Sequence, residues 1–467
     1  MRTLGGLTVP AVPLTGTYLA SAVCFVVALK ALSSPRRARW GNLIGVAGMV
    51  VAVGITLADA HAGHDWIIPI GMVVGTAIGA PAARLVRMTA MPQMVAAFNG
   101  VGGGAAALVS LVEFLHDRSG GVGSQLALEL TFGLIIGCLS LAGSALAFVK
   151  LQELISGRPL TFPGQPGVNA GAAIAVVGLT AGVVAHPNLP TFLAAAAVSL
   201  ALGASVCLPV GGADTPVLIS LLNSLTGLAV AADGFALHNM ILVVAGTLVG
   251  ASGALLTKMM SDGMGRSLPN ILLGGLSTAG AMEAAGAPAG RPVRSAEAAD
   301  VGTLLAYARR VMIVPGYGLA VAQAQHSVVE LTRQLEGRGV EVAYAIHPVA
   351  GRMPGHMNVL LAEADVPYES LDEMDVANAK FAGTDVALVV GANDVVNPAA
   401  RDQPSSPLYG MPILNVDQAR HVVFLKRSMR PGFSGVDNEL LYDPRTVLLF
   451  GDAKQSLDRL VSAVKEA

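Results

Sequence analysis

The chain of 467 residues is 53% hydrophobic and only 13% charged, with a mean hydropathy of +0.62. This composition is typical of membrane proteins, and the length is sufficient for two or more structural units. The net charge of -2 and an aromatic content of 4% argue against a nucleic-acid partner. Cys24, Cys138 and Cys207 lie inside apolar runs without a CxxC pair, so neither a disulfide framework nor a metal site is expected.

The first 260 residues form successive apolar stretches, each close to the roughly 20 residues that a membrane-spanning helix needs. About nine such stretches lie near residues 15–33, 41–59, 66–84, 94–115, 126–149, 168–186, 190–209, 215–232 and 238–259. The first is read as a span, with a cleaved signal peptide as the alternative. Because Gly, Ala and Ser let helices approach closely, we expect a tight multi-span α-helical membrane bundle.

Basic residues in the short loops give the orientation of this bundle. They follow the first, third, fifth and ninth stretches, as Arg36, Arg37, Arg39, Arg84, Arg87, Lys150, Arg158, Lys258 and Arg266. The intervening loops carry little positive charge. We therefore expect a multi-pass protein of the cell inner (plasma) membrane, with its N-terminus outside and its C-terminal domain in the cytoplasm.

A stretch rich in Gly, Ala and Pro, residues 261–292, reads as a linker between a transmembrane domain (1–260) and a soluble domain (293–467). A short helix is expected to open at Ser295-Ala296-Glu297 and to run to about Arg309. Strands are then expected at 311–314, 341–346, 384–390, 412–415, 421–425 and 446–450, with a short addition at 366–369. Apolar strands that alternate with helices predict an α/β domain with a Rossmann-like parallel sheet.

The first of these strands meets a glycine turn, Gly316-Tyr317-Gly318, and a helical pattern then runs from Leu319 to Leu335. Strand, glycine turn and helix place backbone N–H groups against a pyrophosphate. Gly316 would allow the tight turn, and Gly318 would let a phosphate approach the backbone. The third position of the fingerprint is Val321 instead of Gly or Ala, so an ordinary strand-to-helix turn is the alternative.

The second strand ends in His347, where an ordinary NAD site has Asp or Glu to hold the ribose hydroxyl. This difference argues against an ordinary NAD site. The following loop, residues 349–356, has glycines on both sides of Arg352, which suits a loop against phosphate or a purely structural loop equally.

Two further polar clusters follow strands. Residues 391–398, GANDVVNP, come where open α/β sheets place ligand contacts, although Asn and Asp are also common turn formers. Residues 426–433, KRSMRPGF, bring three cations and a Ser to a strand end, which favours a terminal phosphate such as the NADP 2′-phosphate over a solvated charge run.

Several long motifs resemble the beta subunits of the proton-translocating NAD(P) transhydrogenase family. They are GYGLAVAQAQ at 316–325, HPVAGRMPGHMNVLLAEA at 347–364, GANDVVNPAA at 391–400, KRSM at 426–429, FGDAK at 450–454 and PVLISLLNSLTG at 216–227. The resemblance covers essentially the whole chain. It implies a membrane domain joined to an NADP(H)-binding domain in which the nucleotide is flipped relative to a usual Rossmann site.

The fingerprint and the resemblance together assign a set of residues to NADP(H). They are Gly316, Tyr317, Gly318, Val349, Ala350, Gly351, Arg352, Met353, Pro354, Gly391, Ala392, Asn393, Asp394, Val395, Gly410, Met411, Lys426, Arg427, Ser428, Met429, Arg430, Pro431, Gly432, Phe433, Asp452 and Ala453. By the resemblance, Lys426 and Arg427 hold the 2′-phosphate, and Asp394 is the acid near the nicotinamide that takes part in coupling. Some members of the family carry Tyr where Phe433 stands.

The resemblance also assigns a proton path to Asn99, Ser144 and Asn223, which are polar residues within spans. Such residues can instead hydrogen-bond a neighbouring helix. Some members carry His where Asn99 stands, and because Asn has no titratable proton, the proton-binding group stays open. Asp214 lies at the cytoplasmic mouth of the eighth span, where it would face the NADP(H) domain or cap that helix.

Only one dinucleotide fingerprint is present in the sequence, whereas hydride transfer between two nucleotides needs two sites. The resemblance places NAD(H) on an alpha subunit, in a dimer of alpha–beta assemblies within membrane lipid. The implied reaction, of the Si-specific/Re-specific class, is hydride transfer from NADH to NADP coupled to inward proton movement. The alternative is a channel or transporter regulated by a C-terminal nucleotide-binding domain, and cofactor preference would discriminate between the two.

Overall fold

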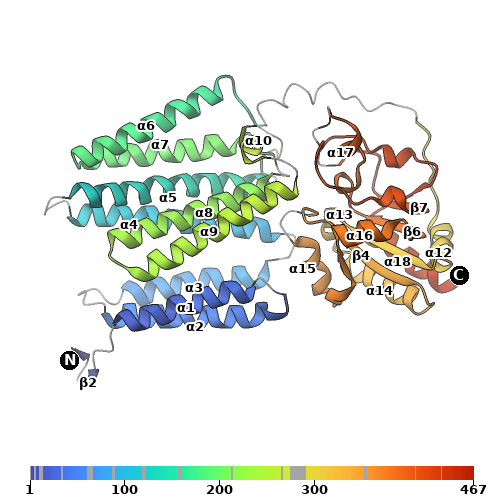
Figure 1. The fold of residues 1–467 in the computed structure, drawn as a ribbon, viewed down its shortest axis with the longest axis horizontal. Coiled ribbons are helices and arrows are strands. Elements are labelled where there is room, and N and C mark those ends of the chain that lie inside the picture. The colour runs from blue at the N-terminus through green and yellow to red at the C-terminus, as the bar shows by residue number, and fades with distance from the viewer. Residues whose placement is uncertain are drawn as a thin grey trace.

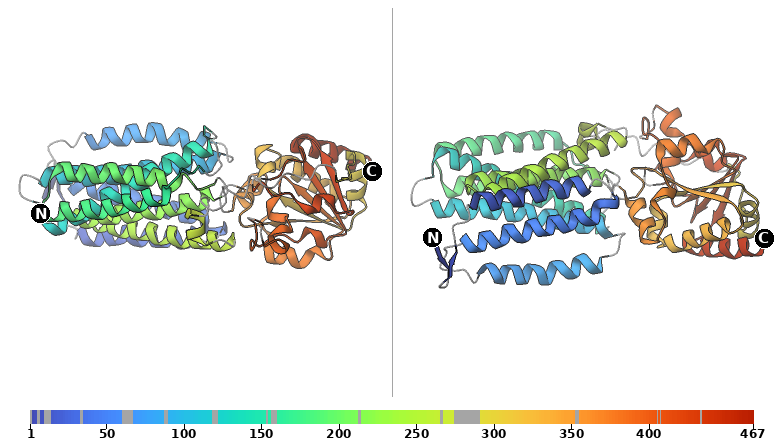
Figure 2. Two further views of the ribbon diagram at one scale, coloured as in Figure 1. Left: turned by 90° about the horizontal axis from the view of Figure 1, so that it is seen from above. Right: turned by 60° about the horizontal axis from the view of Figure 1, so that its bottom comes forward.

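A helical bundle and a sheet domain lie end to end in the computed structural model (Figure 1). It describes residues 2–4, 7–9, 14–32, 35–59, 67–86, 90–117, 122–152, 154–155, 160–211, 214–264, 267–273, 291–351, 355–404, 406, 408–432 and 434–467. The chain starts with two short antiparallel strands, β1 (Arg2–Leu4) and β2 (Leu7–Val9). The N-terminus lies at the end of the bundle away from the sheet domain (Figures 1 and 2).

All nine predicted spans are helices in the described part of the chain. They are α1 (Leu14–Leu32), α2 (Pro35–Asp59), α3 (Ile67–Leu85), α4 (Met91–Asp117), α5 (Ser124–Leu151), α6 (Gln165–Ala185), α7 (Leu189–Cys207), α8 (Thr215–Ala236) and α9 (Met240–Gly263). Seven of them, α3 to α9, are long and apolar enough to cross a membrane. The apolar part of α1, Leu19–Leu32, is shorter, and α2, which opens with three arginines, is not among the seven.

Small residues bring α4, α5 and α8 close together at the centre of the bundle. A Cβ added to Gly103 would lie 3.0 Å from the Gly137 carbonyl oxygen, and one added to Gly137 would lie 2.6 Å from that of Gly103. In contrast, α3 has no buried residue, as expected of a helix that faces lipid or another chain. Lys150, read above as a loop charge, is buried and donates to the carbonyls of Cys207 and Val210 at the end of α7.

The sheet domain has six parallel strands in the order β5-β4-β3-β6-β7-β8. They are β3 (Arg310–Pro315), β4 (Glu341–Ile346), β5 (Leu371–Glu373), β6 (Val386–Val390), β7 (His421–Lys426) and β8 (Thr446–Phe450). This is the strand order of a doubly wound dinucleotide-binding fold, with its switch point between β3 and β6. Buried apolar side chains form one core on each face of the sheet, because the strands alternate their side chains between two helical layers.

Helices cover both faces of this sheet (Figure 2). They are α12 (Ala298–Ala306), α13 (Tyr317–Val321), α14 (Gln325–Glu336), α15 (His356–Glu363), α16 (Met374–Phe381), α17 (Ala399–Asp402) and α18 (Ala453–Glu466). The predicted short helix after Glu297 is α12, and a capping box between Glu297 and Asp300 begins it. Within the expected linker, α10 (Leu268–Leu273) is helical, and residues 274–290 lie outside the described residues.

Three local predictions were wrong. Residues 412–415 form no strand, because Asn378 binds the segment with its side chain, donating to the Ile413 carbonyl and accepting from the Asn415 N–H. The third strand is 371–373 instead of 366–369. The helix expected from Leu319 to Leu335 is broken into α13 and α14, and Gln323 in the break has a left-handed φ of 50°.

Candidate functional site

The glycine turns after β3 and β6 interlock at the switch point of the sheet. The N–H of Gly316 donates to the Val390 carbonyl and that of Gly318 to the Gly391 carbonyl, both at 2.9 Å. A Cβ added to Gly391, whose φ is +71°, would lie 2.5 Å from the Gly318 Cα. The contact between the two loops therefore already requires these glycines, and both N–H groups bind within the protein.

His347, at the end of β4, connects the loop that follows β4 to the segment at Pro412. Its Nδ1 accepts from the Val349 N–H at 3.2 Å, so Nε2 carries the proton and donates to the Pro412 carbonyl at 2.8 Å. Burial lowers the pKa of His347 to about 4, although the bond to Pro412 acts in the opposite direction. The imidazole is therefore neutral near pH 7 and positions the loops.

Val349, two residues further on, reaches the membrane domain. Its half-buried side chain packs against a cluster of buried apolar residues at the ends of α7, α8 and α9, which includes Cys207, Val210 and Val217. Figure 1 likewise shows α13 and α15 beside the ends of the bundle helices. The carboxyl edge of the sheet thus faces the bundle.

Tyr317 and the β4 loop lie side by side. The Tyr317 ring meets that of His356 edge to face, with 6.2 Å between the centroids. Gly351 has a φ of +107°, and a Cβ there would lie 2.6 Å from His356 Nδ1, while Ala350 is buried. The predicted residues Arg352, Met353 and Pro354 lie outside the described residues.

The structure joins the third and fourth predicted clusters into one. Lys426 Nζ donates to Asn393 Oδ1 at 3.1 Å, and Asn393 Nδ2 donates to Asp394 Oδ1 at 3.0 Å. The Ser434 N–H donates to Asp394 Oδ2 at 2.8 Å, and a Cβ on Gly432 would lie 2.4 Å from Oδ1. Burial lowers the pKa of Lys426, while Asp394 raises it, so the ammonium is partly compensated by the carboxylate.

Sequence reasoning missed Asn438, which hydrogen-bonds the backbone of this cluster. Its Nδ2 donates to the Asn393 carbonyl at 3.1 Å and its Oδ1 accepts from the Leu440 N–H, and the residue is 1% exposed. Asn438 follows no strand and belongs to no motif, so nothing in the sequence distinguished it from a turn residue.

The other cationic residues of the fourth cluster are free to meet an anion. Arg427, Ser428 and Arg430 are exposed and Met429 is half-buried, at the end of β7 beside exposed Pro431. Phe433 lies outside the described residues. Two guanidinium groups and a hydroxyl at one strand end can bind a phosphate with charge-assisted hydrogen bonds.

The last predicted residues lie at neighbouring loops. Asp452 caps α18, its Oδ1 accepting from the N–H groups of Lys454 and Gln455, and Ala453 begins that helix. Gly410, with a φ of +85°, and Met411 line a shallow hollow of about 410 Å³ with Arg401 and Tyr409.

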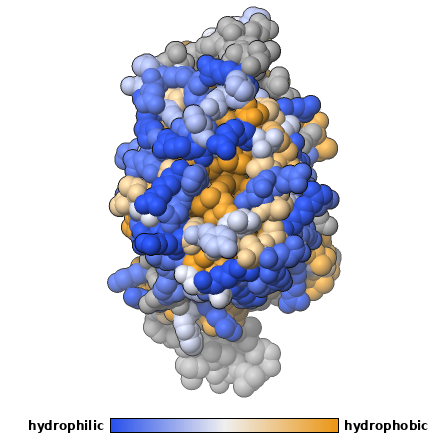
Figure 3. Space-filling model, turned by 90° about the vertical axis from the view of Figure 1, so that its right-hand side faces the viewer, coloured by the Kyte–Doolittle hydropathy of each residue, from blue (hydrophilic) through white to orange (hydrophobic). Residues whose placement is uncertain are grey.

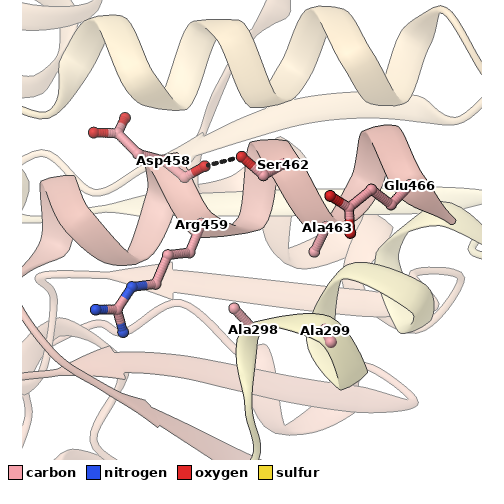
Figure 4. Close-up of a pocket in the computed structure, with 7 residues that line it drawn as sticks. All are labelled: Ala298, Ala299, Asp458, Arg459, Ser462, Ala463 and Glu466. Atoms are coloured by element: carbon pink, nitrogen blue, oxygen red, sulfur yellow. Dashed lines mark hydrogen bonds between the residues drawn. The ribbon is translucent and has the colours of Figure 1, made fainter.

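A second shallow hollow lies between α12 and α18 (Figure 4). There the Ser462 hydroxyl donates to the Asp458 carbonyl of its own helix, and Arg459 and Glu466 point along the surface. The end of the sheet domain away from the bundle is largely hydrophilic, with an apolar strip in its centre (Figure 3). The hollow lies away from the carboxyl edge that carries the predicted residues.

In the bundle, two of the predicted path residues touch. Asn99 Nδ2 on α4 donates to Ser144 Oγ on α5 at 2.8 Å and lies 3.3 Å from Ser140 Oγ. Ser140, which sequence reasoning missed, shares a 2.6 Å hydrogen bond with Thr226 Oγ1 on α8. These four residues form a buried polar layer across three helices, and in the described residues Asn99 Oδ1 has no protein partner.

Asn223 does not join this layer. It is half-buried on α8, and no described residue hydrogen-bonds its side chain. Asp214 is the N-cap residue of α8 by position, is 8% exposed, and makes no side-chain capping bond. A further carboxyl was missed altogether, Asp233 near the other end of α8, whose Oδ1 accepts from Ser110 Oγ at 2.6 Å.

Comparison with known proteins identifies the chain's relatives. A family model described as NAD(P) transhydrogenase beta subunit matches residues 14–463. A curated relative from Rhodospirillum rubrum, named NAD(P) transhydrogenase subunit beta, is 48% identical over 455 residues, 96% of this chain and 98% of the relative. A second relative of the same name, from a particular strain of that organism, matches to the same extent.

Proposed function

Because the chain belongs to the NAD(P) transhydrogenase beta subunit family, we propose that it binds NADP(H) at the carboxyl edge of its sheet and couples hydride transfer to inward proton movement through its bundle. NAD(H), in this proposal, is held by an alpha subunit, and two alpha–beta assemblies form a dimer. The membrane domain comprises residues 1–260, the linker 261–292 and the NADP(H) domain 293–467.

The residues of the carboxyl edge fit a phosphorylated dinucleotide. The glycine turns after β3 and β6 pack against each other at the switch point, which is where other doubly wound sheets bind nucleotides. Arg427 and Arg430 are exposed at the end of β7, where they would hold the 2′-phosphate together with Lys426. The neutral His347 stands where an acid would favour NAD, and so removes the usual partner of a free 2′-hydroxyl.

The bound cofactors supply the hydride chemistry, so the chain needs no nucleophile of its own. Its residues bind and orient NADP(H) and exclude water. Asp394 is held by the Ser434 N–H on one oxygen and by Asn393 on the other, next to the ammonium of Lys426. A nucleotide that displaces any of these partners changes the hydrogen bonding of the carboxylate, which is how Asp394 would sense the nicotinamide.

The observation that carries the coupling proposal is the contact of Val349 with the ends of the membrane helices. The loop assigned to the nucleotide begins at His347 and packs against residues that precede and begin α8, the helix that carries Asp214 and Asn223. A movement of the loop between nucleotide states therefore acts directly on that helix. Proton movement would use the buried polar layer of Asn99, Ser140, Ser144 and Thr226, with water between them, since hydrocarbon carries no proton.

The proposed orientation is supported by the loop charges in the sequence and by the arrangement of the two ends of the bundle. The sheet domain and the N-terminus lie at opposite ends, as an odd number of spans requires (Figure 1). With the N-terminus outside, the sheet domain faces the cytoplasm. Arg87, Arg158 and Arg266, which support this assignment, lie outside the described residues.

The test is an assay of membranes that hold this chain with and without the alpha subunit. We expect hydride transfer from NADH to an NADP analogue only when both chains are present, because this sequence has one dinucleotide fingerprint. Membranes with the alpha subunit alone are the control. Normal steady turnover by this chain, free of partner by mass spectrometry, would contradict the two-chain proposal.

A further inference from the structure

We propose that Asp233 is the group in the bundle that binds and releases the translocated proton, an inference that rests on the proposed function. Asn99, Ser144 and Asn223 hold no titratable proton, so a route through them needs an ionisable group elsewhere. Asp233 is 3% exposed, and apart from Asp214 at the N-cap position of α8 it is the one buried carboxyl in the described parts of the membrane domain. Ionisable residues inside a bilayer are costly and mark ion or proton pathways.

The carboxyl lies where three helices meet. Ser110 from α4 donates to Asp233 Oδ1 at 2.6 Å. On α5, a Cβ added to Gly133 would lie 2.5 Å from Ser110 Oγ and 2.6 Å from Asp233 Oδ1. The absence of a side chain at 133 thus makes the room in which the hydroxyl and the carboxyl meet. One hydroxyl is the only hydrogen-bond donor that the described residues offer to this carboxyl.

The site lies along the same contact of α4, α5 and α8 as the buried polar layer. Thr226 and Asp233 are seven residues apart on α8, which is two helical turns, about 10 Å, and puts them on one face. Between the two levels α4 and α5 touch at Gly103 and Gly137, whose backbones are in contact. Asp233 and the Asn99 layer are therefore two polar sites along the line where α4, α5 and α8 meet, which we call the seam. A layer of small residues separates them.

The position of Asp233 along the bundle indicates which side of the membrane it is closer to. The start of α8 is at the end near Val349, and Asp233 lies 18 residues further on, about 27 Å away. It is thus close to the outer surface in the proposed orientation, where a proton moving inward enters. Asp214 and Asp233 place a buried carboxyl near each end of the same helix, with the polar layer between them.

Binding the proton converts the carboxylate of Asp233 to a neutral carboxylic acid, and release to water on the inner side restores the anion. The free energy of the anion depends on the Ser110 hydroxyl and on the local burial, so a shift of α4 relative to α8 changes whether the proton is held. Among the described residues, the other titratable side chains near this end are Glu113, His116, Asp117, Glu129, His186 and His238, all half-buried or exposed.

The experiment uses the complete alpha–beta complex in sealed vesicles, with nucleotide-driven proton uptake followed by a pH-sensitive dye and NADPH binding measured on the same sample. Asp233→Asn keeps an oxygen that accepts from Ser110 but cannot titrate. We expect loss of proton uptake with NADPH binding retained, and loss of an infrared band of a protonated carboxyl that responds to nucleotide. Asp262→Asn is the matched control, because Asp262 is exposed and pairs with Lys258 on the surface of α9; we expect normal uptake.

Ser110→Ala keeps the carboxyl and removes its donor, so it should shift the pH at which proton uptake is half-maximal. Undiminished uptake in Asp233→Asn overturns the assignment of Asp233. Where Asp233→Asn does not assemble, an unshifted pH profile in Ser110→Ala overturns it instead. Absence of nucleotide-driven uptake in the unaltered complex would overturn the proposed function itself, so the two failures are distinguishable.

Discussion

The sheet domain and the bundle hold their polar groups in different ways. At the carboxyl edge of the sheet, Asn393 takes part in bonds to Lys426, Asp394 and Asn438, and solvent is near. In the bundle, Ser110 is the one hydrogen-bond donor to Asp233 among the described residues, and Gly133 lies beside the carboxyl. When one hydrogen-bond partner is lost at the sheet edge, the other partners and solvent can replace it. In the bundle no other group replaces a lost partner. We therefore expect loop changes to alter ligand affinity and seam changes to alter proton movement.

The largest effect is expected where the two glycine turns interlock. Gly391→Ala combines a left-handed φ of +71° with a Cβ 2.4 Å from the Leu319 nitrogen, so it should cost about 3 kcal/mol or more of stability of the sheet domain. Gly339→Ala is the matched control, since its φ is +86° but nothing lies within 4 Å of the added Cβ. Thermal unfolding of the purified chain would measure both, and equal losses would show that the loop contact contributes nothing.

A comparable effect is expected from pH at His347. The pKa of His347 is about 4 in the folded protein and 6.5, the ordinary value, in the unfolded chain, so folding favours the neutral form. The stabilisation is fully present above pH 6.5 and is lost as the pH falls toward 4, with an upper limit on the order of 3 kcal/mol. His347→Gln should flatten the dependence of sheet-domain unfolding on pH in this window. An unchanged slope between pH 6.5 and 4 would assign the dependence to other groups.

A smaller and more selective effect is expected at the nucleotide edge. Lys426→Ala should weaken NADPH binding by about 1.5–3 kcal/mol, the contribution of a charge-assisted hydrogen bond, and NADH binding little. Titration calorimetry on the purified chain, without the alpha subunit, would measure both affinities. Lys465→Ala, on the exposed surface of α18, is the control. Equal loss for the two nucleotides would show that Lys426 acts by holding the Asn393 loop and not the 2′-phosphate.

The smallest expected difference is between two variants in the bundle. Asn99→Leu removes donors to Ser144 and Ser140, whereas Asn223→Leu changes a residue outside this layer. Both are expected to slow proton uptake in vesicles by placing an apolar plug beside the route. Proton uptake should be slower in the Asn99 variant than in the Asn223 variant. The difference in activation free energy should be roughly the 1 kcal/mol of one hydrogen bond, or more. Undiminished uptake in Asn223→Leu would remove that residue from the route.

Sequence pattern predicted the sheet well because its strands are continuous apolar runs that only a buried position explains. Residues 412–415 were predicted as a further strand, yet the N–H groups of Asn415 and Leu414 donate to Asn378 and Val395 and not to a neighbouring strand. Local pattern carries no information on which partner a backbone takes. The break at Gln323 was missed for a similar reason, since apolar spacing continues across it.

The candidate sites were predictable to different degrees. Motifs placed Asn393, Asp394 and Lys426 at strand ends, and parallel topology brought those ends together. Asp233 and Ser110 are 123 positions apart, and hydropathy reads both simply as parts of spans. Only the packing of α4, α5 and α8 brings them together, through glycines whose role is invisible in a single sequence.

The central claim is that one event links the nucleotide edge to the bundle. The most direct measurement follows hydride transfer and dye-reported proton uptake together in vesicles that contain this chain and the alpha subunit. We predict proton uptake that begins with nucleotide turnover, stops when NADP is exhausted and keeps a constant ratio to hydride transferred. Hydride transfer without proton uptake, or ion flux that persists without turnover, as a regulated channel would give, would contradict the account.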